Sequence, residues 1–436
     1  MTKFERNFLL GSVTAAHQVE GNNIYSDYWV MEHMKTTSFN EPSLDACDHY
    51  NRYEEDIRLL ANANLNTYRF SIEWARIEPK EGKFDKNEIA HYRNVLNCCH
   101  KNGIEPIVCL HHFTSPIWLI KKGGWEKKST IKYFSRYCKY VAEQLGDLMH
   151  YVITINEANI GLQIADIAER YKRLAMEEMK KSKENSTDGS VQVGINLEKM
   201  IKNMGKQKIE NLKIFGRLTP QIFHNPRTEK GDMIIIKAHL EAKDAIKAVN
   251  PNLKVGLSLS LHDIQAIGNG QQNALKYWDK EFTHYLPYIK NDDFFCLQNY
   301  SRSLIDENGI LPVPEGNEIT MMKYEYYPEG LENVIRRVDK EFLQVGKKMP
   351  ILIGENGIST TDDNRRIDYI KTATDGVKAC IDDDIDVFGY LYWSLLDNFE
   401  WQKGFDIKFG LIEVDRKTQT RKPKDSLYYL GSLIKK

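Results

Sequence analysis

The sequence lacks the features that mark proteins of membranes, nucleic-acid complexes and secretory compartments. No apolar run reaches the length of about 18 residues needed to span a bilayer. The first residues, Met1–Asn7, lack the long apolar core of a secretion signal. Its 60 basic and 61 acidic residues give a net charge of −1, so no strong field attracts nucleic acid or an anionic membrane. These absences predict a cytoplasmic protein with neither kind of partner.

Patterns that bind metals or form disulfide frameworks are missing as well. The chain has 7 cysteines, an odd number, and Cys98 and Cys99 are adjacent, which does not resemble a disulfide framework. There is no C-x-x-C pair and no H-E-x-x-H motif, so we expect no metal site and no cofactor. The 42% of hydrophobic residues in a chain of 436 suffice for a large buried core.

The number of domains does not follow from the length alone. An average domain size would give about three domains, but barrels with insertions exceed ~400 residues as one unit. No linker rich in proline and serine divides the chain, and no internal repeat is visible. We therefore expect one domain over residues 1–436.

Short apolar runs alternate with longer segments of helical spacing. Segments Tyr50–Ala61, Ile89–Lys101 and Ile234–Val249 are predicted helices. Eight strands separated by helices predict an α/β fold, a single (β/α)₈ TIM barrel with insertions in the βα-loops. An open doubly wound sheet would need a glycine-rich turn after the first strand, and Gly11–Ala15 is not one. The predicted strands are Phe8–Val13, Asn66–Phe70, Glu105–Leu110, Tyr151–Ile155, Lys254–Ser260, Phe294–Gln298, Ile351–Gly354 and Val387–Tyr392.

The stretch from Ile160 to about Gly231 differs from the rest because it is long and rich in lysine and glutamate. It begins with an apolar stripe that predicts an amphipathic helix. The stripe consists of Ile160, Ile164, Ile167, Tyr171 and Leu174. Residues Lys180–Gly189 then predict a solvated loop on the same side as the expected site. This loop is either an active-site lid or an ordinary surface excursion.

Two glutamates directly follow short apolar strands. Tyr151–Ile155 runs into Asn156 and Glu157, and Ile351–Gly354 runs into Glu355. The carboxyl ends of barrel strands meet at one face, where barrel enzymes carry out their chemistry. Cleavage of a glycosidic bond needs two facing carboxyl groups, one as proton donor and one as nucleophile or base. Either glutamate alone could equally be a solvated strand exit.

Other predicted strands end in amide, imidazole, guanidinium or indole groups. Sugar hydroxyls need hydrogen-bonding groups of this kind, and the C–H face of a pyranose packs on a flat aromatic ring. A Schiff-base enzyme would need a lysine at a strand end, and none of the eight predicted strands provides one. The pattern therefore predicts a sugar site. Its residues are His17, Gln18, Arg69, His111, His112, Gln298, Asn299, Tyr300 and the segment Trp393–Trp401.

Five segments together are similar to the motifs of a known enzyme family: Phe8–Gly21, Tyr68–Ile77, Leu110–Leu119, Ile353–Gly357 and Tyr392–Trp401. They resemble glycoside hydrolase family 1, the β-glucosidase and β-galactosidase family, whose members adopt a (β/α)₈ barrel. The resemblance extends from Phe8 to about Leu430 and is weakest between Ala158 and Gly231.

The resemblance implies a role for each matching residue. Glu355 would be the nucleophile, Glu157 the acid/base, and Arg69 and Tyr300 would hold and tune the nucleophile. The implied sugar-binding residues are Gln18, His112, Asn156, Trp393, Glu400 and Trp401. The chain departs from the family pattern at Ala158, where proline is usual, and at Gln298 and Asn299, where Asn-Tyr is commoner. These departures concern the leaving-group subsites more than the chemistry.

The implied activity is that of a retaining, exo-acting β-glycosidase. Its substrate would be a neutral small-molecule β-glycoside or oligosaccharide with a terminal β-D-glucosyl, galactosyl or fucosyl residue, cleaved through a covalent glycosyl-enzyme. A transglycosidase would use the same residues. A 6-phospho-β-glucosidase is disfavoured because Glu400 would repel a phosphate. A non-catalytic sugar-binding protein is the alternative from another class. The sequence sets neither the sugar preference nor the oligomeric state.

Overall fold

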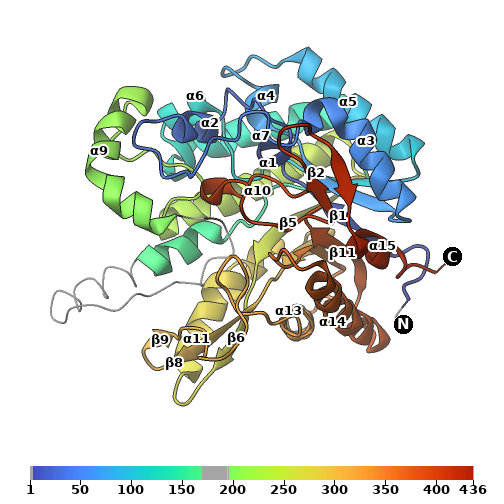
Figure 1. The fold of residues 1–436 in the computed structure, drawn as a ribbon. Helices are drawn as coiled ribbons and strands as arrows, with labels where there is room; N and C mark the ends of the chain where they lie inside the picture. The colour runs from blue at the N-terminus through green and yellow to red at the C-terminus, as the bar shows by residue number, and fades with distance from the viewer. Residues whose placement is uncertain (1–2, 169–193, 195, 436) are drawn as a thin grey trace.

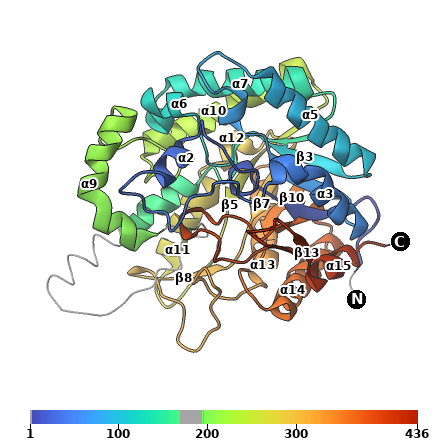
Figure 2. The same cartoon turned by 45° about the horizontal axis from the view of Figure 1, so that its top comes forward.

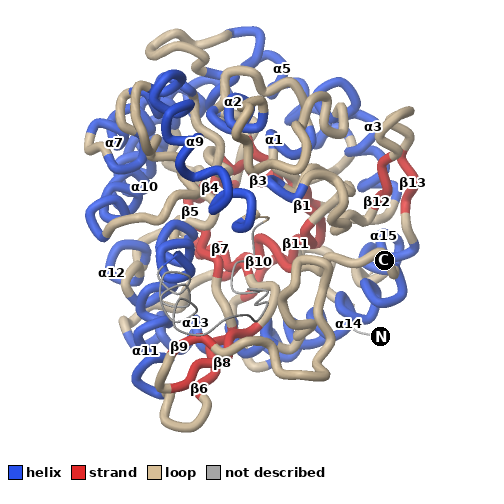
Figure 3. Tube along the Cα trace, turned by 60° about the vertical axis from the view of Figure 1, so that its left-hand side comes forward, coloured by secondary structure: helices blue, strands red, loops and turns tan. Residues whose placement is uncertain are grey.

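The computed structural model describes residues 3–168, 194 and 196–435 (Figure 1). Eight parallel strands close into a barrel in the order β1-β11-β10-β7-β5-β4-β3-β2, and Figure 3 looks toward this ring. All eight predicted strands are present, with ends within two residues of the expected ones, so the closed barrel is confirmed and the open sheet is wrong. The strands are β1 (Leu9–Val13), β2 (Thr67–Ser71), β3 (Glu105–Cys109), β4 (Tyr151–Ile153), β5 (Lys254–Ser260), β7 (Phe294–Gln298), β10 (Ile351–Asn356) and β11 (Val387–Trp393).

The barrel closes where the two ends of the chain meet. β1 pairs in parallel with β11, with Leu9 opposite Gly389 and Val13 opposite Trp393, and it pairs with β2 on its other side. On the other side of β1 the backbones also approach closely: a Cβ on Gly11 would lie 1.9 Å from the carbonyl oxygen of Thr67 in β2. Only glycine fits there.

Helices form the outer layer, as Figures 1 and 2 show from two directions. The three predicted helices are confirmed as α3 (His49–Asn62), α5 (Lys86–Lys101) and α10 (Glu229–Val249). α5 and α10 begin earlier than expected because capping side chains start them: Asp85 accepts from the N–H of Asn87, and Thr228 from that of Gly231. The other covering helices are α7 (Ser129–Leu145), α11 (Gln271–Trp278), α12 (Leu286–Ile289), α13 (Gly330–Gln344), α14 (Asp363–Asp382) and α15 (Asp425–Gly431).

Shorter elements and insertions surround the barrel. Residues 160–168 are helical, and Ile160, Ile164 and Ile167 are buried as the stripe predicts. Tyr171, Leu174 and the predicted loop at 180–189 lie outside the described residues. Helix α9 was not predicted. The remaining elements are α1 (Ala16–Val19), α2 (Asp27–Glu32), α4 (Trp74–Ile77), α6 (Ile117–Lys121), η1 (Gly124–Glu126), α9 (Leu197–Phe215), β6 (Asp263–Ala266), η2 (Asp279–Thr283), β8 (Arg302–Asp306), β9 (Gly309–Ile310), η3 (Trp401–Lys403), β12 (Ile412–Val414) and β13 (Arg421–Pro423).

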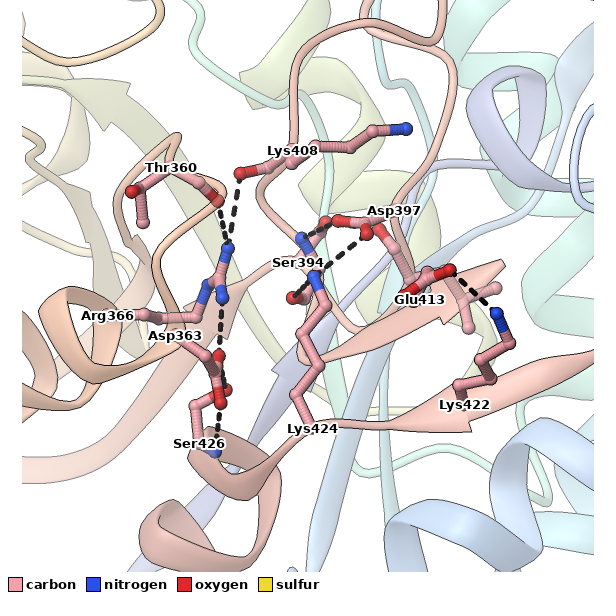
Figure 4. A network of polar contacts seen from close by, with 12 residues as sticks. Thr360, Asp363, Arg366, Ser394, Asp397, Lys408, Glu413, Lys422, Lys424 and Ser426 are labelled. Carbon is pink, nitrogen blue, oxygen red and sulfur yellow. Dashed lines mark hydrogen bonds and ion pairs between the residues drawn. The ribbon is translucent and has the colours of Figure 1, made fainter. Parts of the chain in front are cut away.

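A polar network anchors the loops that follow β10 and β11 (Figure 4). Arg366 of α14 donates to the backbone carbonyl groups of Thr360 and Lys408, one from each loop. Asp397 accepts from the N–H of Gly410 at 2.8 Å and forms a 2.8 Å ion pair with Lys424, just before α15. The C-terminal segment thus holds the loop that carries Glu400 and Trp401.

No helix within residues 3–168 and 196–435 is both long enough and apolar enough to cross a membrane.

Candidate active site

Glu355 lies on β10 at the carboxyl end of the barrel, and two buried donors hold its carboxyl group. The ladder between β10 and β7 shifts register between Ile353 and Glu355, an irregularity typical of strands beside active sites. Arg69 of β2 donates from Nη1 to Glu355 Oε1 at 2.5 Å. Tyr300, just after β7, donates its hydroxyl hydrogen to Glu355 Oε2 at 2.8 Å. Both carboxyl oxygens therefore have a strong partner.

Asn156, just after β4, is the hub of the polar network. Its Oδ1 accepts from Arg69 Nη2, and also from Gln298 Nε2 at 2.5 Å and Ser258 Oγ at 3.4 Å. These donors fix the amide orientation, so Nδ2 donates to His112 Nε2 at 3.3 Å. The proton of the neutral imidazole then sits on Nδ1, which is buried without a partner among the described residues. His112 thus has a free donor.

Glu157 follows Asn156 in a left-handed backbone conformation, with φ of 43°. Its side chain is buried, and Oε2 has no hydrogen-bond partner among the described residues. The next residue, Ala158, donates its N–H to the carbonyl oxygen of Ser258 at 2.9 Å. Proline could not make this bond, so the departure from the family pattern adds a link between the exit of β4 and β5.

The two glutamates differ in how firmly they hold a proton. Burial, and then the charge of Glu355, raise the pKa of Glu157 well above its usual range. Burial also raises the pKa of Glu355, but the charge of Arg69 and the hydrogen bond from Tyr300 oppose the rise. Glu157 is therefore the member of the pair that keeps a proton, and Glu355 is the member that ionises first.

Glu400 and Gln18 form a second polar pair: Glu400 comes from the loop after β11, and Gln18 from α1, the short helix that follows β1. Gln18 Nε2 donates to the carbonyl oxygen of Phe399 at 2.8 Å and to Glu400 Oε2 at 3.3 Å. Gln18 Oε1 is buried without a partner among the described residues, which leaves an acceptor free. Burial raises the pKa of Glu400 to about 8. A backbone hydrogen bond from Gly194 and the side-chain hydrogen bond from Gln18 oppose this rise, while the charge of Glu355 adds to it.

Two tryptophans line the same region. The rings of Trp393 and His112 stack with centroids 5.7 Å apart, and the ring of Trp401 lies 6.2 Å from that of His112. Trp401 also stacks on His17 at 5.9 Å, with the two planes only 2° apart. The peptide bond between Trp393 and Ser394 is cis. The structure thus brings the predicted catalytic and sugar-binding residues into one connected group.

Sequence reasoning missed some members of this group and misplaced others. Gln298 contacts Asn156, whereas Asn299 donates to the carbonyl groups of Leu261 and Ser301 and so supports the loop. Tyr324 was missed: it is buried, and its ring lies 6.3 Å from that of Tyr300. It comes from a loop without periodicity, so no local signal could reveal it.

Two histidines from the predicted group, His17 and His111, form hydrogen bonds with residues outside the predicted group. His111 Nε2 contacts Ser115 Oγ at 3.1 Å and lies edge-on to Trp125. His17 Nδ1 contacts Asn23 Nδ2 at 3.1 Å. In the part of the chain that is described, no group of three or more histidine, cysteine, aspartate or glutamate side chains could hold a metal ion.

Comparison with known proteins gives the family. The family model described as "Glycosyl hydrolase family 1" matches residues 1–173 and 290–436. The chain belongs to this family. It is 30% identical over 481 residues to "Beta-glucosidase A" of Acetivibrio thermocellus, covering 99% of this chain and 98% of the relative. The crystal structure of the β-glycosidase BGL167 superimposes with a TM-score of 0.85 at 40% identity, covering 98% of this chain and 96% of that one.

Family 1 relatives differ in substrate. A "6-phospho-beta-galactosidase" of Staphylococcus haemolyticus is 28% identical over 489 residues, with 99% of this chain and 98% of the relative covered. The family 1 chain is thus a β-glucosidase-like glycoside hydrolase with a (β/α)₈ barrel. Family membership alone does not separate neutral from phosphorylated sugars.

Proposed function

We propose that this protein is a retaining, exo-acting β-glycosidase that releases a terminal β-D-glucosyl residue, or the galactosyl or fucosyl equivalent, from a neutral glycoside. The observation that carries the proposal is the asymmetry of the glutamate pair. Arg69 and Tyr300 both donate to Glu355, while Glu157 has an unpartnered oxygen among the described residues and a pKa raised well above its usual range. One group is prepared as an anion and the other as an acid.

In the first step, the ionised Glu355 attacks the anomeric carbon. The bond from that carbon to the glycosidic oxygen breaks, and the proton of Glu157 moves to the departing oxygen. Esterification removes the charge of Glu355, which is one cause of the raised pKa of Glu157. The pKa of Glu157 then falls, so Glu157 stays ionised after it has given up its proton. In this form it can accept a proton from water.

In the second step, the water oxygen attacks the anomeric carbon and the ester bond to Glu355 breaks. The proton returns to Glu157, and both glutamates regain their starting states. Two displacements at one carbon retain its configuration. Retaining enzymes hold their carboxyl groups about 5 Å apart, and the effect of Glu355 on the pKa of Glu157 supports such a close pair.

The sugar-binding roles follow from groups that lack partners. Gln18 Oε1 can accept from a hydroxyl, and His112 Nδ1 can donate to one. Glu400 would accept from the 4- and 6-hydroxyls, with Trp401 beside it. Trp393 would be the floor on which the C–H face of the sugar stacks. Asn156 completes the set, and residues 1–436 would act as one barrel domain.

Three alternatives use the same residues differently. A 6-phosphoglycosidase would need cations at the far edge of the sugar, where the carboxylate of Glu400 would instead repel a phosphate. A transglycosidase would differ only in the acceptor that attacks the ester. A non-catalytic sugar-binding protein would not need Glu355 to be held between Arg69 and Tyr300.

A matched substrate pair tests the proposal. We expect hydrolysis of nitrophenyl β-D-glucoside or β-D-galactoside, and almost none of the corresponding 6-phosphates. Proton NMR at early times should show the β-anomer of the free sugar first. Preference for the phosphorylated substrate would overturn the reading of Glu400, and initial release of the α-anomer would overturn the retaining mechanism. Absence of turnover with every glycoside would favour a sugar-binding protein.

A further inference from the structure

Gly194 lies directly against the loop that carries Glu400. Its N–H donates to the Glu400 carboxyl group, and its carbonyl oxygen accepts from the N–H of Gln402 at 3.0 Å. Asn196 donates its N–H to Gln402 Oε1 at 2.7 Å. Gly194 and Asn196 lie between the two ranges that the family model matches, whereas Glu400 and Gln402 lie within the second range.

The contact leaves no room for a side chain at position 194. A Cβ on Gly194 would lie 2.5 Å from the carbonyl oxygen of Glu400 and 3.2 Å from its Cγ. The first distance is far inside van der Waals contact, and its partner is backbone, which cannot rotate away. Any larger residue must therefore shift either the backbone at position 194 or the segment that carries Glu400, and either shift alters the contact between them.

Helix α9 fixes the position of Gly194. Glu210 accepts hydrogen bonds from the backbone N–H groups of residues 35 and 36, each at 3.0 Å. Asn196, which caps α9, donates from Nδ2 to Asn40 Oδ1 at 3.0 Å. The N–H of Asn40 in turn donates to the carbonyl oxygen of Gln402 at 3.0 Å. The loop after β1, the start of α9 and the loop after β11 therefore form one hydrogen-bonded unit.

We propose that Gly194 is a positioning residue for Glu400, and that it thereby determines how strongly the site selects sugars bearing a 6-hydroxyl. The inference rests on the proposed role of Glu400 in binding the 4- and 6-hydroxyls. Among the described residues, the Glu400 carboxyl group has hydrogen bonds from Gln18 and Gly194. One side chain and one peptide group thus set its direction. A carboxyl group that moves by about 1 Å no longer has its hydrogen bonds to the sugar aligned.

The test compares Gly194→Ala with Gly205→Ala. Gly205 lies within α9, and a Cβ there meets nothing within 4 Å, so this substitution controls for the loss of glycine. The substrates are nitrophenyl β-D-glucoside and its 6-deoxy analogue. For Gly194→Ala we expect kcat/KM for the glucoside to fall roughly tenfold or more, in line with one lost hydrogen bond to a charged or buried group. The value of kcat/KM for the 6-deoxy substrate should fall much less. The ratio of kcat/KM for the glucoside to kcat/KM for its 6-deoxy analogue should therefore become smaller. Gly205→Ala should keep the wild-type ratio.

Each outcome bears on one proposal. A folded Gly194→Ala variant with the wild-type ratio would overturn the positioning role. If Gly194→Ala does not fold, Gln402→Ala decides instead, because it removes the side-chain acceptor of Asn196 and should narrow the same ratio by a smaller factor. An unchanged ratio in Gln402→Ala would then overturn the role. Failure of the wild-type protein to hydrolyse any β-glycoside would overturn the proposed function itself.

Discussion

Replacing Tyr300 with phenylalanine tests the asymmetry on which the proposed mechanism depends. The substitution removes the hydroxyl group that donates to Glu355 Oε2 at 2.8 Å and leaves the ring. A hydrogen bond to a charged group contributes about 1.5–3 kcal/mol, and each ~1.4 kcal/mol corresponds to a factor of ten. The ionised form of Glu355 should therefore become roughly 10- to 150-fold less favoured relative to the protonated form.

The sign of the effect on activity follows from which form reacts. The Tyr300 hydrogen bond lowers the pKa of Glu355, so its loss raises that pKa further. Only the ionised form attacks the anomeric carbon. The acidic limb of kcat/KM, measured against pH with nitrophenyl β-glucoside, should thus move to higher pH in Tyr300→Phe. Activity at low pH should fall much more than activity on the alkaline side.

Tyr390→Phe provides a matched control. Tyr390 is a buried tyrosine on β11 whose hydroxyl donates at 2.8 Å to Asn356 Oδ1, a neutral amide next to Glu355. The Tyr390→Phe variant loses a hydrogen bond of the same length, but the lost bond does not involve the carboxyl group of Glu355. We expect lower stability, by about 0.5–1.5 kcal/mol, but an unmoved acidic limb. An unmoved limb in Tyr300→Phe, or an equal movement in both variants, would contradict the reasoning.

The other predictions concern the three buried glutamates. Glu355→Ala should abolish hydrolysis, and azide should restore turnover as a glycosyl azide of inverted configuration; near-normal activity without azide would exclude Glu355 as nucleophile. Glu157→Gln should slow alkyl glycosides by roughly 10²–10⁴-fold and activated nitrophenyl glycosides much less, whereas equal losses would argue against general acid catalysis by Glu157. Burial raises the pKa of Glu400 to about 8 from 4.5, so its share of the unfolding free energy is complete below pH 4.5 and is lost as pH rises toward 8. The free energy of unfolding of Glu400→Gln, measured with denaturant, should therefore rise relative to that of the wild type between pH 5 and pH 8. A difference between the two free energies that does not change with pH would refute this.

Sequence reasoning recovered the barrel because its signals are local. Each strand is a short apolar run, and caps such as Asp85 and Thr228 mark where helices begin. Arg69 and Glu355 are 286 residues apart, yet their meeting was predictable because both lie on barrel strands, Arg69 within β2 and Glu355 near the carboxyl end of β10. Their individual roles came from the family resemblance rather than from periodicity.

The parts that could not be predicted depend on contacts between distant segments without such a rule. Gln298 and Asn156 are 142 residues apart; strand ends place both at one face of the barrel, but nothing in either local sequence indicates that they bond to each other. Tyr324 enters the site from an irregular loop. The hydrogen bond from the N–H of Ala158 to the carbonyl oxygen of Ser258 depends on how the segment after β4 is aligned with β5, which the identity of residue 158 does not reveal. The need for glycine at position 194 becomes visible only in the structure, where a Cβ at this position would clash with the carbonyl oxygen of Glu400.

The seam between β1 and β11 has a consequence for how the protein is made. During synthesis β1 leaves the ribosome before the other barrel strands and β11 after them, yet the two are neighbours in the finished sheet. Until β11 arrives, the incomplete sheet has two free edges, and free edges invite pairing with other chains. The proposed sugar site is divided in the same way, because Gln18 follows β1 and Glu400 follows β11. A nascent chain stopped before β11 therefore lacks both a closed sheet and the proposed sugar-binding residues Trp393, Glu400 and Trp401.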